Sequence, residues 1–548
     1  MTFFVALDYV VLGAVLCISA GIGIYYRFSG GKQKTNQEYL LGGRSQGIVP
    51  VAFSIMASFM SAITLLGTSA EIYSHGFIFV TINFTYIAAI PIITNFYMPV
   101  FFNLGYVSVY EYLEKRFGTA TRLACSLVFI LQGVLYMGVV LYAPALALEA
   151  VSGMSQSSAI LIVGFVCVFY STIGGIKAVI MTDVFQSLLM YAALFCVIGV
   201  SLVNAHGISD IWKVAEENGR INLLNFNLDP TERHSLFSIF IGGVFIFISL
   251  FGVNQIQVQR YLTTKDLGAA SRSLWLALPL LSFLEVSACL CGLCLLYKYH
   301  DCDPIRTGRV KSNDQLMPLF VLDTMGRYPG LPGLFVAGMF SAALSTISGA
   351  INSLAAVTLE DYIRNIDALH ALAYGCVCIG IAFLSKYLGS VLQAAFTIFG
   401  VVGGPLLAVF TLGVLAPLCN EKVRLLTVLW SCIFCMAWIG GPKPAVPNLP
   451  TTLDGCSHQQ QLYFNGTINF KSEEDSTEFS YLYRISYMYY VLLGFLTTFL
   501  VGIIVSCFTK RNNKLNPALY SPSYNLRNKK RRKKRSQKLT PVLYCLNH

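Results

Sequence analysis

Charged residues are scarce in this chain of 548 residues. Asp, Glu, Lys and Arg make up 12% of it, about half of the usual share in soluble proteins, whereas 55% of the residues are hydrophobic. This composition argues against a soluble multidomain protein. Apolar stretches of about 17–25 residues recur instead, and each is long enough to cross a bilayer as a helix.

We therefore predict an all-α membrane protein with about 13 transmembrane helices. The predicted spans are 5–26, 47–71, 76–104, 123–150, 158–174, 179–204, 236–258, 273–297, 333–361, 368–386, 391–415, 425–440 and 485–507.

Motifs for nucleotide binding and for hydrolysis are also missing. The chain has no Walker loop, no H-E-x-x-H and no G-x-S-x-G pattern. ATP-driven transport by this chain and hydrolysis of the familiar kinds therefore lack their parts, and we do not expect an enzyme. Energy for transport must come from a gradient, or the protein merely conducts.

Acidic residues are missing from the C-terminal tail. Residues 510–548 hold twelve basic and no acidic side chains, so the net charge of +11 arises there, and the rest sums to −1 (26 basic minus 27 acidic). We interpret 508–548 as a basic cytoplasmic tail near anionic lipid, at about 1 kcal/mol per basic residue close to the surface, and not as a nucleic-acid-binding segment. A disordered, solvated tail is compatible with this interpretation.

Basic residues orient the spans, because they gather in every second loop. Those loops are predicted to be cytoplasmic, which puts the N-terminus outside and the C-terminus inside. The loops 205–235, 299–332 and 441–484 would then be extracellular. The orienting residues are Arg27, Lys32, Lys34, Arg44, Lys115, Arg116, Arg122, Lys177, Arg260, Lys265, Arg272, Arg364, Lys422 and Arg424.

Two features of these extracellular loops fit that orientation. Asn465, in Asn-Gly-Thr, is a predicted glycosylation site. Cys302 and Cys456 lie in two of the loops and are a candidate disulfide pair.

Two apolar spans carry several hydroxyl groups at bilayer depth, where polar groups are costly. The segments 57–64 and 341–348 read Ala-Ser-Phe-Met-Ser-Ala-Ile-Thr and Ser-Ala-Ala-Leu-Ser-Thr-Ile-Ser. Hydroxyls and free carbonyls persist in hydrocarbon mainly where they line a cavity or bind something polar. Oxygen ligands suit a hard cation, so the segments predict a sodium site. The commoner alternative, for either segment alone, is a hydroxyl bonded back to its own helix.

Ionisable and amide side chains also lie within or at the ends of apolar spans. Asp183 and Gln186 lie one helical turn apart and can present oxygens to a cation, although an aspartate there can also simply favour a helix N-terminus. Gln255 belongs to the run Asn-Gln-Ile-Gln, which indicates unwound backbone, a cavity wall or the interfacial end of a helix. Glu285 lies in mid-span, and the sequence offers it no evident partner.

The blocks Gly174–Gln186, Asn254–Leu262, Asp314–Pro318 and Ser345–Ser353 carry a family resemblance. They closely resemble the sodium/solute symporter family, best its animal branch of sodium-coupled monocarboxylate, multivitamin and iodide transporters. The resemblance covers roughly residues 8–509 and implies alternating access around inverted repeats.

This resemblance implies a symporter domain over residues 1–507 with a LeuT-like core of five plus five inverted helices. The core would lie at about 47–415. The sequence itself indicates breaks near Ala57 and Phe251, because spans two to six and seven to eleven can be paired as two halves with interrupted spans at corresponding places. The peripheral spans would be 5–26, 425–440 and 485–507.

The resemblance also implies which residues bind the transported species. The common sodium site would consist of the backbone oxygens of Ala57, Met60 and Ala342 and the hydroxyls of Ser345 and Thr346. Candidates for a second sodium site are Ser58, Asp183, Gln186 and Gln255. Candidates for lining the substrate are Thr64, Asn83, Phe251 and Gln393.

Sugar is disfavoured as the substrate. Sugar-transporting relatives carry an aromatic pair before the Asn-Gln motif, and the corresponding positions here look like Phe251 and Gly252. The cationic residue that those relatives use in the following span is missing from this chain. We expect a plasma-membrane sodium symporter that imports a small organic anion, either a monocarboxylate or a vitamin such as biotin or pantothenate. The alternatives are an iodide-like inorganic anion symporter and a channel or non-transporting sensor on the same scaffold. The connection 363–370 is shorter than is usual in the family, and a short loop can restrain the ninth span against the tenth.

Overall fold

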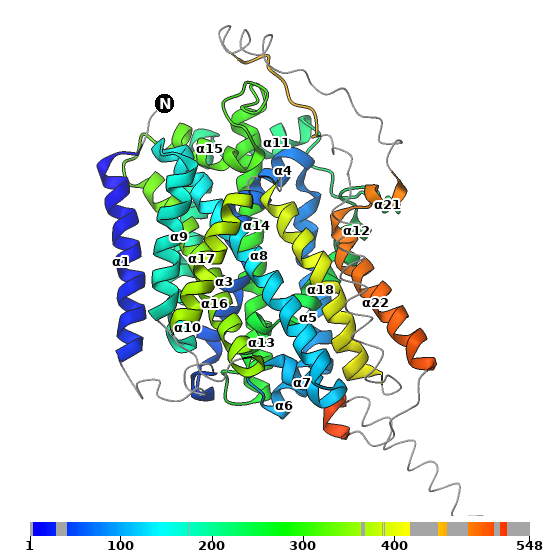
Figure 1. The fold of residues 1–548 in the computed structure, drawn as a ribbon. Helices are drawn as coiled ribbons and strands as arrows, with labels where there is room; N and C mark the ends of the chain where they lie inside the picture. Colours follow the sequence, from blue (N-terminus) through cyan, green and yellow to red (C-terminus); the bar gives the residue numbers. More distant parts are fainter. Residues whose placement is uncertain are drawn as a thin grey trace, which may run out of the picture.

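The computed structural model describes residues 4–28, 41–173, 175–362, 368–385, 387, 390–416, 448–456, 480–508 and 516–522. Helices occupy every predicted span within these residues, and the predicted span 425–440 lies outside them. Figure 1 shows the long helices running side by side as a bundle.

Nine helical segments of the described residues are long and apolar enough to cross a membrane, or ten if one bent pair is a single span. The total of about thirteen stays a prediction. Seven of the nine segments are built on α1 (Ala6–Phe28), α8 (Thr119–Ser152), α10 (Ile176–Asn204), α14 (Leu267–Tyr299), α16 (Leu331–Asp361), α18 (Val391–Leu415) and α22 (Tyr490–Cys507), and the other two are Phe77–Leu104 and Leu236–Val253. The apolar helices α9 (Gln156–Ile173) and α17 (Ala368–Ser385) do not count among the nine.

Two spans are broken in the middle, at the places expected from the sequence. The first consists of α3 (Ile48–Phe59), η2 (Thr64–Thr68) and α4 (Ser69–His75), whose two halves are bent by 61°. Met60, directly after α3, has an extended backbone (φ −76°, ψ 100°). We call this interruption the first break. A bend of this size leaves backbone groups outside the helical hydrogen-bond pattern.

The second broken span consists of α12 (Leu236–Ile248), η5 (Ser249–Val253) and α13 (Gln255–Tyr261). Asn254 is extended (φ −77°, ψ 129°), and its side chain accepts a hydrogen bond from the backbone N–H of Ile256 at 2.9 Å. An asparagine cap of this kind starts the new helix and fixes the position of the break.

Helix α16 lies between several other helices. It packs against α1, α3, α8, α9 and α10, and nearly all of its residues are buried. A Cβ atom on Gly338 would lie 2.5 Å from the Cβ of Ala193, so the close approach of α16 to α10 requires a glycine there. This packing brings the hydroxyl-rich part of α16 to the end of α3.

The span 77–104 is built from η3 (Phe77–Ile82), α5 (Asn83–Ile92), η4 (Ile93–Tyr97) and α6 (Met98–Leu104). Figure 1 shows α6 and α7 (Val109–Phe117) at one end of the bundle, and α11 (Ile208–Glu217) and α15 (Leu316–Met325) at the other. We call the end with α11 and α15 the N-terminal face, because α1 begins there, and the other end the opposite face.

Both faces are tied to segments distant in sequence. At the N-terminal face Cys302 and Cys456 form a disulfide, with their Cα atoms 5.0 Å apart. At the opposite face the hydroxyl of Tyr112 donates to the carbonyl oxygen of Leu519 at 3.1 Å, which fixes the start of the C-terminal tail to α7. Asn465 and residues 363–367 of the short connection lie outside the described residues.

Candidate functional site

The end of α3 and the middle of α16 meet at the first break. Ser345 Oγ donates to the carbonyl oxygen of Ala57 at 2.9 Å and lies 3.0 Å from that of Ala342. Thr346 Oγ1 donates to the same Ala342 oxygen at 3.1 Å. Ala57, Ala342, Ser345 and Thr346 are thus joined by hydrogen bonds. Met60 stands at the break itself, and all five residues are buried.

The two interpretations of these hydroxyls are compatible in the structure. Thr346 donates its proton to Ala342 of its own helix, as the structural interpretation requires, whereas the single proton of Ser345 is shared between Ala342 and Ala57 of α3. A hydroxyl that donates its proton still has two lone pairs on its oxygen. The two hydroxyl oxygens can therefore face a cation while their protons point to the carbonyl oxygens of Ala57 and Ala342.

A buried ion pair lies on the opposite-face side of the first break. Ser54 Oγ donates to Asp183 Oδ2 at 2.6 Å, and Arg260 Nη2 lies 3.4 Å from the same oxygen. Arg260 Nε donates to Ser54 Oγ at 2.9 Å, and all three side chains are fully buried. The pair joins α3, α10 and α13. A cation at Asp183 would have to share the carboxylate with the guanidinium.

The other candidates for a second sodium site have different surroundings. Gln255 accepts from the backbone N–H of Val109 at 2.9 Å and donates to the carbonyl oxygen of Val107 at 2.7 Å. Ser58 Oγ accepts from Gln257 Nε2 at 2.9 Å. Both amide atoms of Gln186 are buried with no hydrogen-bond partner among the described residues. Ser58, Asp183 and Gln255 thus have separate hydrogen-bond partners, and no hydrogen bond among the described residues joins them to Gln186.

Aromatic rings surround one of the substrate candidates. The ring of Phe251 stacks on that of Phe247 with centroids 4.1 Å apart and meets the ring of Phe59 edge-on at 5.2 Å. Tyr86 lies against the other side of Phe247 at 4.3 Å. Phe251 thus belongs to an apolar cluster beside the first break.

The other three substrate candidates have different surroundings. Thr64 is half-buried at the start of η2. Asn83 donates to the carbonyl oxygen of Val80 at 2.7 Å, within its own segment. Gln393, near the start of α18, lines a separate cavity.

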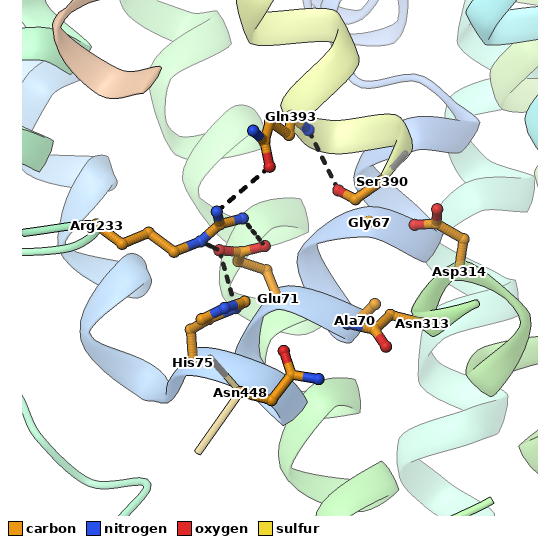
Figure 2. A pocket seen from close by; sticks show the side chains of 10 residues that line it. All are labelled: Gly67, Ala70, Glu71, His75, Arg233, Asn313, Asp314, Ser390, Gln393 and Asn448. Carbon is orange, nitrogen blue, oxygen red and sulfur yellow. Dashed lines mark hydrogen bonds and ion pairs between the residues drawn. The ribbon is translucent and has the colours of Figure 1, made fainter. Parts of the chain in front are cut away.

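That cavity, of about 240 Å³, lies between α4, the start of α18 and the segments before α12 and α15 (Figure 2). On one side Arg233 forms a bidentate ion pair with Glu71: Nε lies 2.6 Å from Oε1 and Nη2 lies 3.0 Å from Oε2. Arg233 Nη1 also donates to Gln393 Oε1 at 3.3 Å. This clamp connects α4 to α18 beyond the first break, on the side of the N-terminal face.

The charges of the clamp are stabilised by its geometry. Burial opposes the charge of Arg233, but the Glu71 carboxylate raises the pKa of the guanidinium above its usual range. His234 Nε2 lies 3.3 Å from Glu71 Oε1. Burial lowers the pKa of His234 to about 3, so this imidazole is neutral at physiological pH.

Asp314 lines the other side of the cavity. Its Oδ2 accepts from the backbone N–H of Val391, the first residue of α18, at 3.1 Å. Its Oδ1 is buried and has no hydrogen-bond partner among the described residues. Burial raises the pKa of this carboxyl group to about 7, against the hydrogen bond from Val391, and the Glu71 carboxylate adds to the rise.

Glu285 has a partner that the sequence did not reveal. Thr68 Oγ1 donates to Glu285 Oε1 at 3.2 Å, which links α14 to the outer half of the first broken span. Next to this contact Ser69 Oγ donates to the carbonyl oxygen of Ala288 at 3.0 Å.

Comparison with known proteins decides the family. The model of the sodium:solute symporter family matches residues 39–430. The chain belongs to this family. It is 52% identical to the "Putative sodium-dependent multivitamin transporter" of Drosophila melanogaster, over 91% of this chain and 86% of that protein. It is 43% identical to sodium-coupled monocarboxylate transporter 1 of Homo sapiens, over 94% of this chain and 89% of that protein.

Two solved structures share the fold of this chain. A Na⁺-coupled sialic acid symporter in a substrate-bound outward-open state aligns with a TM-score of 0.75 and 24% identity, over 94% of this chain and all of that one. Mhp1, a nucleobase-cation-symport-1 family transporter, aligns with a TM-score of 0.53 and 14% identity, over 85% and 95% of the two chains. The chain is thus a multi-pass membrane transporter and not an enzyme, and its family supports sodium as the co-transported ion.

Sequence reasoning missed the charged side chains that face one another across the bundle. Glu71 ends a predicted span, and Arg233 lies just before another, so both read as ordinary boundary residues. A glutamate so close to bilayer depth was the only signal, because intramembrane charges need partners. Arg260 served as an orienting charge only, although it is fully buried.

Proposed function

We propose that this chain is a sodium-coupled symporter of the plasma membrane that imports a small organic anion by alternating access. The anion would be a monocarboxylate or a vitamin such as biotin or pantothenate. The names of the relatives support this substrate class, because they include a multivitamin and a monocarboxylate transporter.

One observation carries the proposal: the oxygen atoms of Ala57, Ala342, Ser345 and Thr346 converge at the first break. Carbonyl and hydroxyl oxygens without a formal charge suit a weakly held monovalent cation. Sodium held between α3 and α16 would stabilise the conformations in which these two helices touch. Such a differential affinity is what a coupling ion needs in order to shift a conformational equilibrium.

The surroundings of the first break suit an organic anion. Phe59, Phe247 and Phe251 form an apolar wall beside the first break, and Thr64 lies at the start of η2, two residues after the helix resumes at Ala62. The bound sodium would supply positive charge beside the anion. We place Thr64 and Phe251 at the substrate and Asn83 and Gln393 farther from it.

Access to the site would be controlled from both faces. The Asp183–Arg260 pair closes the bundle on the side of the opposite face, and the Glu71–Arg233 clamp spans the side of the N-terminal face. Lys115, which the positive-inside rule makes cytoplasmic, lies in α7 on the opposite face. The N-terminal face would therefore be extracellular, and a membrane potential would drive positive charge inward, at about 2.3 kcal/mol per charge per 100 mV.

Uptake in cells that express the full chain tests the proposal. Labelled lactate, butyrate, biotin and pantothenate are offered in sodium and in choline medium, with current recorded in parallel. We expect saturable, sodium-dependent accumulation of at least one of these anions, accompanied by inward current. Sodium-dependent current without accumulation would indicate a channel or sensor. Uptake of iodide alone, or of neutral sugars alone, would refute the organic-anion substrate.

A further inference from the structure

Asp314 has a buried carboxylate group at the wall of the cavity. The residue is 2% exposed, and within the described part of the chain its side chain has one hydrogen bond, which Oδ2 accepts from the backbone N–H of Val391. Oδ1 has no partner among the described residues. Figure 2 shows the carboxylate directed toward Gly67 and Ser390 at the wall of the cavity. An ionised carboxylate in this position needs a positive partner, because burial without one is costly.

The other charges of the cavity do not supply that partner. The guanidinium of Arg233 is engaged by both oxygens of Glu71, and His75 Nδ1 also faces Glu71, at 3.3 Å. With Asp314 ionised, the side chains of Glu71, Asp314 and Arg233 give the cavity two negative charges and one positive charge. Its excess of one negative charge attracts a cation and disfavours an anion.

The remaining groups define the chemistry of that cation. Asn313 uses its amide N–H on Ser74 Oγ at 2.8 Å and so offers its side-chain oxygen, and Ser390 contributes a hydroxyl. The described residues contain no group of three His, Cys, Asp or Glu side chains that could hold a metal ion. A transition metal therefore lacks its ligands, whereas a partly hydrated sodium ion fits a polar space of about 240 Å³.

The cavity lies next to the central sodium site. Gly67 lines it and is three residues from Thr64, the first residue of η2, in the helix that resumes at Ala62 after the first break. We propose that this cavity is an outer cation site, in which Asp314 holds sodium before the ion reaches Ala57, Ser345 and Thr346. The role in loading rests on the proposed sodium symport, while the binding of sodium at Asp314 does not.

Tracer binding of ²²Na⁺ to the purified full chain in lipid nanodiscs tests the site without transport. Thr346→Ala removes a ligand of the central site, so the sodium that this variant still binds reports the outer site. Asp314→Asn removes the charge but keeps an oxygen that accepts from Val391. Asp323→Asn is the matched control, because Asp323 lies at the N-terminal face and pairs with Arg309 instead of lining the cavity.

We expect Thr346→Ala to retain saturable ²²Na⁺ binding, and the double variant with Asp314→Asn to lose it. In uptake, Asp314→Asn alone should raise the sodium concentration for half-maximal rate by roughly tenfold, because ligand charge sets cation affinity, and Asp323→Asn should not. Absence of residual binding in Thr346→Ala, or equal binding in the double variant, would overturn the outer site. If the wild type transports nothing, the proposed function fails, yet the binding arm still decides this inference.

Discussion

At the scale of single residues, substitution of Thr346 distinguishes two roles of its hydroxyl: a ligand of sodium, or only a hydrogen bond within its own helix. Its proton goes to Ala342 at 3.1 Å, and its oxygen lies at the first break. Thr346→Ala should raise the sodium concentration for half-maximal uptake strongly with near-normal surface expression, because the volume change is small. Thr498→Ala is the control: this buried hydroxyl bonds back to Gly494 at 2.7 Å in α22. Equal sodium activation in both variants would remove Thr346 from the site.

Asp183 neutralises a buried guanidinium, which makes its substitution more costly than the loss of a helix cap. Asp183→Asn leaves Arg260 buried without a counter-charge, at about 3–5 kcal/mol, whereas Asn and Asp cap a helix almost equally well. We expect a lower unfolding midpoint of the purified protein and impaired coupling. Adding Arg260→Gln should recover part of the stability. An unchanged midpoint in Asp183→Asn would show that the ion pair contributes little.

The carboxyl group of Asp314 predicts how stability depends on pH. Its pKa rises from 3.8 in water to about 7 through burial, so in sodium-free buffer the folded state binds a proton that the unfolded state has released. Stability from this group is present below pH 4 and is lost as pH rises to 7. Thermal unfolding of wild type and Asp314→Asn across pH 5–8 measures this. The variant should lose the pH dependence due to this group, while parallel curves would contradict the assignment.

The sequence revealed side chains whose chemistry conflicts with their immediate neighbours, and it missed those that are explained by distant partners. Ser345 and Thr346 stood out because hydroxyls are costly in an apolar run. Arg233 meets Glu71 over 162 residues and Arg260 meets Asp183 over 77 residues, and no local pattern records such pairs. The assignment of Gln255 to sodium rested on resemblance, and the structure engages its side chain with the backbone of Val107 and Val109.

At the scale of helices, the contact between α14 and α4 depends on one glycine. A Cβ on Gly292 would lie 2.5 Å from the Cβ of Ile72 and 2.7 Å from the carbonyl oxygen of Ser69. Gly292→Ala should therefore push the helices apart and destabilise the protein by about 1–3 kcal/mol. Gly199→Ala in α10 meets nothing within 4 Å and should be neutral or stabilising, because alanine favours helix. Unfolding midpoints in detergent compare the two, and equal midpoints would contradict this account of the packing.

The two breaks could be predicted at this scale, because polar residues interrupt apolar runs there. Helix boundaries were also close: the expected range 391–415 coincides with α18. The outer half of the first broken span was underestimated, since α4 continues to His75 whereas the predicted span stops at residue 71. Its last turn is polar because it lines the cavity with Glu71 and His75, and a hydropathy pattern cannot distinguish such a wall from the end of a span.

At the scale of the whole molecule, the fold class and the family followed from composition and from short motifs. The contact between α3 and α16 could not be derived in this way, because it depends on the packing of many helices. The inverted relation of the two halves stays a prediction, supported by the two broken spans. Orientation in the membrane rests on the positive-inside rule and is open to a direct test.

The disulfide between Cys302 and Cys456 provides that test, because it lies at the N-terminal face. In Cys302→Ser the thiol of Cys456 becomes free, and a membrane-impermeant maleimide added to intact cells should label it. The double variant with Cys456→Ser is the control: its labelling reports other cysteines, such as Cys17, Cys376 and Cys507, which are exposed in the wild type, and is subtracted from that of Cys302→Ser. If the N-terminal face is extracellular, the difference appears in intact cells. A difference seen only after permeabilisation would reverse the orientation, and with it the direction in which the Glu71–Arg233 clamp and the outer cation site face.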